Sequence, residues 1–374
     1  MQVRRNAIPL GRIFGIPVGL DLSWFLIFGL ITWSLATSYF PNEFIGWPPG
    51  RYWIVAAVTA VLFFASVLLH ELGHSVVAQG FRVPVRRITL FIFGGVAELA
   101  GDLPSAAAEF WIAIAGPAVS FLLAAIFFAL QIVFRPIAPA FATFEYLAMI
   151  NGTLALFNLI PGFPLDGGRV LRAVLWAFNR NLLRATHIAA TVGRIIAFGF
   201  IGFGVLQMFR GNFANGLWIA FIGWFLENAA GAELQMQQLQ GILSGYRVER
   251  AMTRDFRTVP QATTLQSVVD DHILGYGRRT LAVADEGEIV GLLTLHHIRE
   301  VPRERWPETT AAMAMTPLTD CRCTTPETSL WDALREMDRN GVNQLPVRSN
   351  SHVVGMLSRE DVISFLRAVE ELGL

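Results

Sequence analysis

Long apolar runs dominate the first two thirds of the chain and constrain its fold more than any other feature. Each run could cross the roughly 30 Å of bilayer hydrocarbon as a helix. The runs lie near residues 15–38, 52–80, 108–134, 141–161, 187–209 and 213–232. The 374 residues are 53% hydrophobic and only 16% charged, whereas soluble domains carry about 25% charged residues. We therefore predict a mainly α polytopic membrane protein with about six transmembrane helices.

The last two runs are the least regular, because Arg194 lies inside one of them and a short polar connection separates them. They could instead form a helical hairpin that crosses the bilayer only partly. The basic start before the first run resembles a secretion signal, but the run is long and lacks a small-residue cleavage site. We interpret it as a retained anchor.

The charges predict the orientation of these spans. The formal net charge is zero and all 29 basic residues are arginine, so no global basic field indicates nucleic acid as a partner. If the spans alternate, arginines collect on one side, which should be cytoplasmic. That side holds Arg4, Arg5, Arg12, Arg82, Arg86, Arg87, Arg169, Arg172, Arg180 and Arg184, against Arg51, Arg135 and Arg210 on the other. We expect a multi-pass cell-membrane protein with both termini in the cytoplasm.

The sequence His70-Glu71-Leu72-Gly73-His74 lies inside the second run. Residues four apart share one face of a helix, so His70 and His74 can hold one metal ion from the same side. Glu71 lies beside the pair and can reach a metal-bound water without binding the metal. Ionisable groups in a spanning segment are costly and indicate a functional site. This layout is typical of a zinc hydrolase. The simpler alternative is two helix-face histidines satisfied by their neighbours.

A catalytic zinc usually has three protein ligands, so two histidines leave one ligand to be found. The candidate is Asp166, in a stretch where Pro161 and Pro164 end the fourth span. Irregular backbone at membrane depth needs a cavity or protein to satisfy it, which places Asp166 on a loop facing a cavity. On these residues alone, a plain helix stop in which Asp166 pairs with Arg169 is slightly favoured.

Taken together, the motifs resemble the site-2 proteases, intramembrane zinc metalloproteases related to peptidase M50. The resemblance covers nearly all of residues 1–230. It rests on His70-Glu71-x-x-His74, Ala115-Gly116-Pro117 and the N-L-x-P-x-x-P-L-D-G-G form of Asn158 through Gly168. It implies one Zn²⁺ per chain, held by His70, His74 and Asp166. It also implies Glu71 as general base and Asn158 as a group that steadies the oxyanion or the substrate backbone.

Residues 88–96 are β-branched and aromatic and break at two glycines. We expect a membrane-associated strand or hairpin here. In the resembling family a similar segment lies beside the zinc, and an exposed strand edge could pair with an unwound substrate. An apolar loop that packs on the helices is the alternative of equal weight.

The C-terminal third is polar and contains two similar halves. Ala251-Met252-Thr253 and the stretch Thr280 through Val283 return in order as Ala314-Met315-Thr316 and Gln344 through Val347. This repeat resembles a pair of CBS domains, which together form a cytoplasmic α/β Bateman module. We predict a transmembrane metalloprotease domain over 1–234, a linker over 235–245, and CBS domains over 246–307 and 308–374.

CBS pairs often bind ATP or another adenine nucleotide, and they can form homodimers. In the resembling modules a Ser/Thr-x-x-Asp sequence holds the ribose, which Ser358 and Asp361 match. In the first repeat Thr294 is present, but His297 takes the place of the expected carboxylate. N-capping of a helix explains the same residues equally well.

The resulting hypothesis is an endopeptidase that cleaves a membrane-anchored protein within or near its spanning segment, under control of the CBS pair. A CBS-regulated transporter or channel is the alternative from another class. Glu71 discriminates between them, because transport needs only ligands whereas hydrolysis needs that base. A catalytically silent scaffold is disfavoured, because all four expected site residues are present.

Overall fold

The computed structural model describes residues 7–92, 94–99, 103–256, 258–274, 280–350 and 352–373. Arg4, Arg5 and Phe93, which enter the predictions above, lie outside these ranges. The chain divides into two compact units, Met1–Gln237 and Gln238–Leu374. Each unit is described by itself below.

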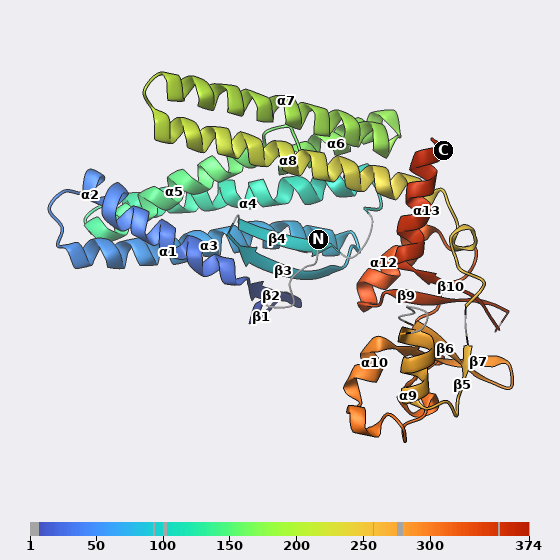
Figure 1. The fold of residues 1–374 in the computed structure, drawn as a ribbon. Coiled ribbons are helices and arrows are strands. Elements are labelled where there is room, and N and C mark those ends of the chain that lie inside the picture. Colours follow the sequence, from blue (N-terminus) through green and yellow to red (C-terminus); the bar gives the residue numbers. More distant parts are fainter. Residues whose placement is uncertain are drawn as a thin grey trace. The chain divides into compact units, whose positions relative to one another are not determined.

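Five helical segments among the described residues are long and apolar enough to cross a membrane. The first, Leu22–Glu43, comprises α1 (Leu22–Ser34), a π-helical turn (Leu35–Tyr39) and α2 (Phe40–Glu43); the others are α3 (Pro49–Gly80), α4 (Ala106–Val133), α5 (Ala138–Asn158) and α7 (Leu182–Phe209). Figure 1 shows the long helices of this unit lying side by side. The predicted fold class, spanning helices followed by an α/β module, is confirmed.

The sixth predicted span lies within α8 (Phe213–Ser244). It is helical as predicted, but it is not among the five candidate spans of the described chain. Asn215, Glu227 and Asn228 interrupt its apolar residues and lower its mean hydropathy. The shorter helix α6 (Asp166–Asn179) precedes the hairpin of α7 and α8.

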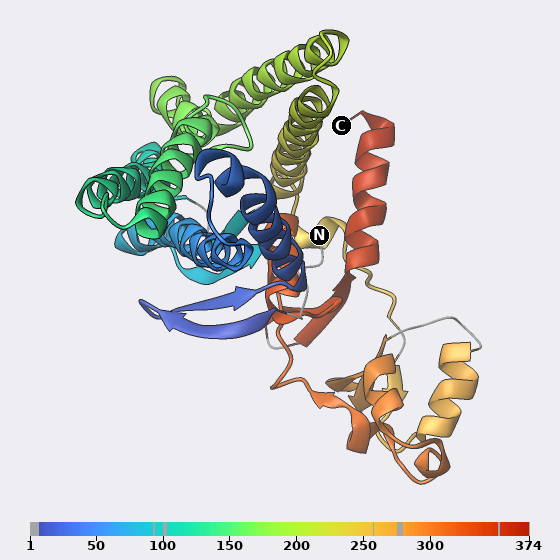
Figure 2. The same cartoon turned by 90° about the vertical axis from the view of Figure 1, so that its left-hand side faces the viewer.

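The first predicted span starts too early. Residues 15–20 belong to a β-hairpin of β1 (Ile8–Ile13) and β2 (Ile16–Leu20). Phe14 and Gly15 both have positive φ at its turn, as a two-residue hairpin connection requires. The helix begins only after Asp21, whose side chain accepts a hydrogen bond from Ser23 N at 2.9 Å. Figure 2 shows this blue hairpin extending away from the helices.

The predicted hairpin over residues 88–96 forms, as β3 (Val85–Phe91) and β4 (Gly94–Leu99) in antiparallel pairing. It belongs to a four-stranded sheet in the order β1-β2-β3-β4, in which β2 and β3 run parallel. The hairpin contacts α3, the helix that carries both histidines. Ile88 and Leu90 are buried on that side, in clusters with Leu72 and Val67 of α3.

Most of the predicted linker over 235–245 is helical, because α8 continues through it to Ser244. Glutamine is a good helix former, so a polar glutamine-rich stretch prolongs a helix without a break. Leu243, in the last turn of α8, is fully buried in the core of the second unit.

The second unit contains the predicted repeat. Its elements are β5 (Thr258–Pro260), α9 (Leu265–Ser267), β6 (Thr280–Asp285), β7 (Glu288–Thr294), α10 (Leu295–Glu300), α11 (Ala311–Ala314), β8 (Thr316–Pro317), α12 (Leu330–Asn340), β9 (Gln344–Ser349), β10 (His352–Ser358) and α13 (Arg359–Leu372). In each half an antiparallel hairpin runs directly into a helix, as β6-β7-α10 and as β9-β10-α13. One sheet has the order β5-β6-β7-β8, and β9 pairs with β10 in another.

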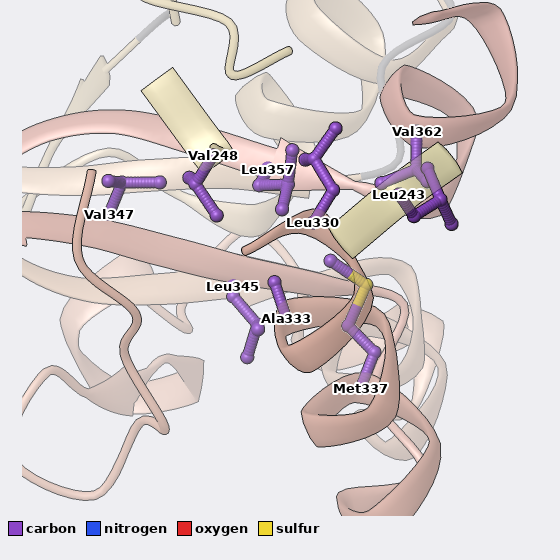
Figure 3. Packing of buried hydrophobic residues seen from close by; sticks show 9 residues of the cluster. All are labelled: Leu243, Val248, Leu330, Ala333, Met337, Leu345, Val347, Leu357 and Val362. Carbon is purple, nitrogen blue, oxygen red and sulfur yellow. The ribbon is translucent and has the colours of Figure 1, made fainter. Parts of the chain in front are cut away.

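Each half has its own apolar core, and Figure 3 shows that of the second half. Its members are Leu243, Val248, Leu330, Ala333, Met337, Leu345, Val347, Leu357 and Val362. A smaller cluster of Ala282, Leu292 and Met356 joins residues from both halves. Their pseudo-repeated strands therefore pack as one module.

Candidate metal centre

The two histidines lie on consecutive turns of α3, near its C-terminal end. This helix starts at Pro49, where proline is tolerated, and runs unbroken to Gly80. His70 and His74 are only 4% and 5% exposed, so their ring nitrogens need partners inside the protein. Their Nε2 atoms lie 3.2 Å apart. The helical spacing thus directs both rings at one point, as predicted.

Asp166 comes to the same point from α6. Its Oδ2 lies 3.2 Å from His70 Nε2 and 3.1 Å from His74 Nε2. The structure corrects one detail, because Asp166 is the first residue of α6 and not part of a loop. An acidic residue in the first turn is favoured by the helix dipole. The alternative pairing with Arg169 is not found among the described side chains, since no ion pair joins the two.

Gly167 and Gly168 explain how α6 can begin so close to the preceding loop. A Cβ on Gly167 would lie 2.3 Å from the carbonyl oxygen of Leu159, and one on Gly168 would lie 2.4 Å from the carbonyl carbon of Gly162. Real side chains do not tolerate such distances. The two glycines therefore bring the backbone of the loop against α6 and hold Asp166 at the histidines.

The other nitrogen of each histidine is held by α4. His74 Nδ1 donates to the carbonyl oxygen of Ile112 at 2.6 Å, and His70 Nδ1 is hydrogen-bonded to Ser120 Oγ at 2.8 Å. Because Nδ1 of His74 is a donor, Nε2 of the neutral ring carries a lone pair. That lone pair faces a carboxylate oxygen, so the arrangement is favourable with a metal ion between the two atoms or with a proton on Nε2.

Gly116 lies directly against the two rings. A Cβ at this position would be 2.2 Å from His74 Nε2 and 2.6 Å from His70 Nε2. Gly73 of α3 lies close to α4, because a Cβ at this position would be 2.8 Å from Val119 Cγ2. Small residues thus let α3 and α4 approach closely enough for α4 to support the imidazoles.

The three side chains suit a zinc ion in number, type and spacing. His70, His74 and Asp166 offer ligand atoms that all lie within 4.8 Å of one another. Donors bound at about 2.1 Å to a tetrahedral zinc stand about 3.4 Å apart, close to the observed separations. Two imidazoles and a carboxylate leave a fourth position open for water, as in a hydrolytic site. The described residues could therefore hold zinc.

Glu71 and the ligand atoms line a cavity of about 950 Å³. A Cβ on Gly95 of β4 would lie 2.4 Å from Glu71 Cγ, so the strand packs directly on this side chain. Asn158, the last residue of α5, lines the same cavity. The remaining walls are mostly apolar and include Leu30, Phe63, Val67, Leu154, Phe157, Trp218, Phe221, Ile222 and Phe225. The cavity thus combines a polar end with room for an apolar chain.

The predicted nucleotide residues of the second unit act as helix caps. Ser358 and Asp361 form a reciprocal capping box at the start of α13, and Asp361 Oδ1 also accepts from Thr253 Oγ1 at 3.1 Å. Thr294 forms the corresponding box with His297 at α10. Burial lowers the pKa of His297, which favours the neutral ring that accepts from Thr294 N.

Sequence reasoning missed how α4 supports the site. Gly116 enters the sequence prediction only as part of a family motif. Ile112 acts through its backbone carbonyl, and no side-chain pattern predicts such a contact. Arg172 is one of the arginines that predict the cytoplasmic side. In the structure its side chain is 7% exposed and bonded to buried Glu109. Glu109 could have been found from the sequence, because it is a charged residue in the first turn of a long apolar run.

The model of peptidase family M50 matches residues 58–137 and 137–200, and that of the CBS domain matches 248–304 and 313–368. A relative from Mycobacterium tuberculosis (strain ATCC 35801 / TMC 107 / Erdman), named "Putative zinc metalloprotease Rip3", is 39% identical over 96% of this chain and 92% of its own length. Another, "Putative zinc metalloprotease sll0528" of Synechocystis sp. (strain ATCC 27184 / PCC 6803 / Kazusa), is 35% identical over 98% of this chain and 97% of its own.

Among solved structures, the site-2 protease from Methanocaldococcus jannaschii is 33% identical, with a TM-score of 0.43 over 61% of this chain and 95% of that one. The identity to the curated relatives extends over nearly the whole chain and includes both units. The membrane-spanning helices, the M50 match and the tandem CBS match occur together in one polypeptide. The chain therefore belongs to the zinc metalloproteases of peptidase family M50 that carry a C-terminal pair of CBS domains.

Proposed function

We propose that this protein is an intramembrane endopeptidase that cleaves a membrane-anchored protein within or near its spanning segment. The observation that carries the proposal is the convergence of His70, His74 and Asp166 beside Glu71, in an apolar cavity among candidate spans. A soluble protease has no need to surround its site with apolar helices. An apolar cavity at a metal site suits a substrate that arrives from the bilayer.

In the proposed site His70, His74 and Asp166 hold one zinc ion. Zinc, when bound there, supplies a water of lowered pKa and polarises the carbonyl to be attacked. Glu71 accepts the proton of the attacking water and passes it to the departing amine. The side-chain NH₂ group of Asn158 donates a hydrogen bond to the oxygen of the scissile carbonyl. The apolar walls exclude bulk water, which strengthens each of these interactions.

A substrate strand has a natural place beside β4. This strand ends the sheet order β1-β2-β3-β4, and Gly95 on it touches Glu71. A helical peptide bond is shielded by its own hydrogen bonds, so the substrate has to unwind before cleavage. Among the described strands, none pairs with the outer edge of β4. Pairing of the unwound segment with this edge would satisfy its backbone and bring a peptide bond to Glu71.

We propose that both termini and both CBS domains lie in the cytoplasm, because the arginine-rich side of a membrane protein is usually cytoplasmic. This orientation requires α8 to cross the membrane as a sixth span. We assign the transmembrane protease domain to 1–234, the connecting segment to 235–245, and the CBS domains to 246–307 and 308–374. The CBS model matches within each of the last two ranges, which supports their division.

We further propose that ATP or another adenine nucleotide binds the CBS pair near Ser358 and Asp361, or near Thr294, and changes protease activity. Thr253 hydrogen-bonds Asp361, so a ribose at this carboxylate would replace that contact. Calorimetric titration of the full chain with ATP should show binding that Asp361→Asn weakens at least about tenfold, the loss of roughly one charged hydrogen bond. Absence of heat at millimolar ATP would refute the proposal, and a homodimer through these domains would appear in the same samples by light scattering.

The protease mechanism is tested by Glu71→Gln. The amide cannot accept the proton, so we expect a loss of cleavage of at least about a hundredfold, while the zinc content stays at one per chain. Cleavage of a model transmembrane substrate in reconstituted vesicles and elemental analysis of the same sample measure both. Glu288→Gln, on an exposed strand end, is the matched control and should cleave normally. Unchanged cleavage by Glu71→Gln would remove the proposed mechanism, whereas absence of cleavage by the wild type would favour a transport function.

A further inference from the structure

A buried ion pair joins α4 to α6 close to the candidate metal centre. Arg172 Nε donates to Glu109 Oε1 at 2.6 Å, and Arg172 Nη2 contacts the same oxygen. Glu109 is fully buried and Arg172 is 7% exposed. The guanidinium also stacks over the ring of Phe163, 4.9 Å from its centroid. Glu233 of α8 completes the cluster, with Oε1 at 3.4 Å from Arg172 Nη1.

Stability alone is a weak reason for this pair. Taking two charges out of water costs about as much as their attraction returns, and apolar replacements of both partners are often neutral. Glu109 Oε2 has no hydrogen-bond partner among the described residues, which makes the arrangement costlier still. A costly and geometrically specific contact is better explained by what it holds in place.

The face of α4 that carries Glu109 also carries the supports of the two histidines. Glu109, Ile112, Gly116 and Ser120 follow one another at helical spacing. Ile112 accepts from His74, Gly116 lies against both rings, and Ser120 bonds His70. Glu109 is the member of this face that reaches α6, the helix that starts with Asp166. The two histidines thus contact this face directly, and Asp166 is connected to it through Arg172 of its own helix.

Along α6, Gly168 and Arg172 lie one turn apart and share the side that packs inward. Gly168 presses against the loop at Gly162, and Arg172 stacks on Phe163 of that loop. The loop and the helix that together present Asp166 are therefore clamped by one guanidinium. Loss of this clamp would let the first turn of α6 shift relative to α3.

We propose that Arg172 and Glu109 are positioning residues for the third zinc ligand, and that they set the distance of Asp166 from the two histidines. The inference rests on the proposed function, in which Asp166 binds zinc. Supports of metal ligands are typically worth 10- to 100-fold in metal affinity when removed. We expect that range for loss of the pair.

The experiment compares Arg172→Met with the double variant Glu109→Leu/Arg172→Met. The single variant leaves a buried carboxylate unpaired, whereas the double variant removes both charges and should keep the thermal stability of the metal-free protein. Zinc affinity of the full chain in detergent is measured by competition with a chelator. Both variants should bind zinc 10- to 100-fold more weakly, and cleavage should recover when free zinc is raised. Arg172→Lys, which keeps the charge but not the planar fork, should fall between them and the wild type.

The matched control is another ion pair between two helices of this unit, Arg194 of α7 with Glu227 of α8 at 3.2 Å. Arg194→Met should leave zinc affinity unchanged, because neither helix carries a candidate ligand. Wild-type zinc affinity in the double variant would overturn the inference, as would a loss of affinity that only tracks a loss of stability. If the wild type itself bound no zinc, the proposed function would fail instead, so the two failures are distinguishable.

Discussion

At the scale of single residues, the absence of a side chain matters as much as the ligands themselves. Gly116 leaves the space into which the Nε2 atoms of both histidines point. Its neighbour Pro117 lies inside α4 without ending it. Proline cannot donate to the carbonyl four residues earlier, which is that of Ala113. The neighbouring carbonyl of Ile112 accepts from His74.

We predict that Gly116→Ala abolishes metal binding. The added methyl would lie 2.2 Å from His74 Nε2, so one ring has to leave its position and the ligand geometry is lost. Zinc content of the purified protein, measured by elemental analysis, should fall below about one tenth of the wild-type value, in line with at least a tenfold loss of affinity. Gly152→Ala in α5 is the control, since its nearest neighbour would be the Cβ of Ala124 at 3.9 Å. Full zinc occupancy in Gly116→Ala would contradict this description of the site.

At the scale of elements, α3 and β4 enclose Glu71 between them. Side chains alternate along a strand, and glycine at position 95 leaves room for the carboxylate where any other residue would contact it. The edge position of β4 makes it available for an added strand, which natural sheets usually cover or block. The element therefore has two roles in the proposed reaction: it packs on the base and it receives the substrate.

We predict that Gly95→Val lowers cleavage at least about tenfold, a loss of the size expected for a displaced catalytic group. Zinc content should stay unchanged, because the nearest atoms to a Cβ at position 95 all belong to Glu71 and not to a candidate ligand. Val96→Ala on the same strand, at a side chain that is 46% exposed, serves as the control and should retain activity. The cleavage rate in vesicles and the zinc content of the same samples are measured. A loss of zinc in Gly95→Val would mean that the strand supports the ligands and not Glu71.

At the scale of the whole molecule, α8 belongs to both units. Trp218, Phe221 and Phe225 of this helix line the cavity, and Leu239 and Leu243 belong to the apolar core of the second unit. The helix continues from Phe213 to Ser244, so the segment that joins the two units is helical. Because Leu243 is fully buried in that core, we expect the last turn of α8 to contribute to the stability of the second unit.

Leu243→Ala should destabilise the fragment 238–374 by about 2–5 kcal/mol, the usual cost of truncating a fully buried leucine. Its side chain is fully buried, whereas Leu372 is 72% exposed, so Leu372→Ala should change stability by less than about 0.5 kcal/mol. Urea denaturation of the three fragments measures the difference. Equal midpoints for Leu243→Ala and the wild type would mean that α8 is not part of this core.

Much of the architecture could be predicted because it depends on near neighbours along the chain. Hydropathy over about 20 residues identified the spans, four-residue spacing identified the histidine pair, and the repeat identified the tandem module. The prediction was wrong at the start of the first span, because a short strand and an apolar helix have similar composition. It was also wrong in placing Asp166 on a loop, since this residue begins α6.

By itself the sequence determined a membrane-spanning chain with a zinc-binding motif and a C-terminal repeat. Only the tertiary structure decided how the site is completed. Asp166 meets His70 across 96 positions of sequence, and Arg172 meets Glu109 across 63. No local pattern reports such pairings, because they depend on which helices pack together and on glycines that let them approach. The ligand types were thus readable in the chain, while their common support by α4 arose from helix packing.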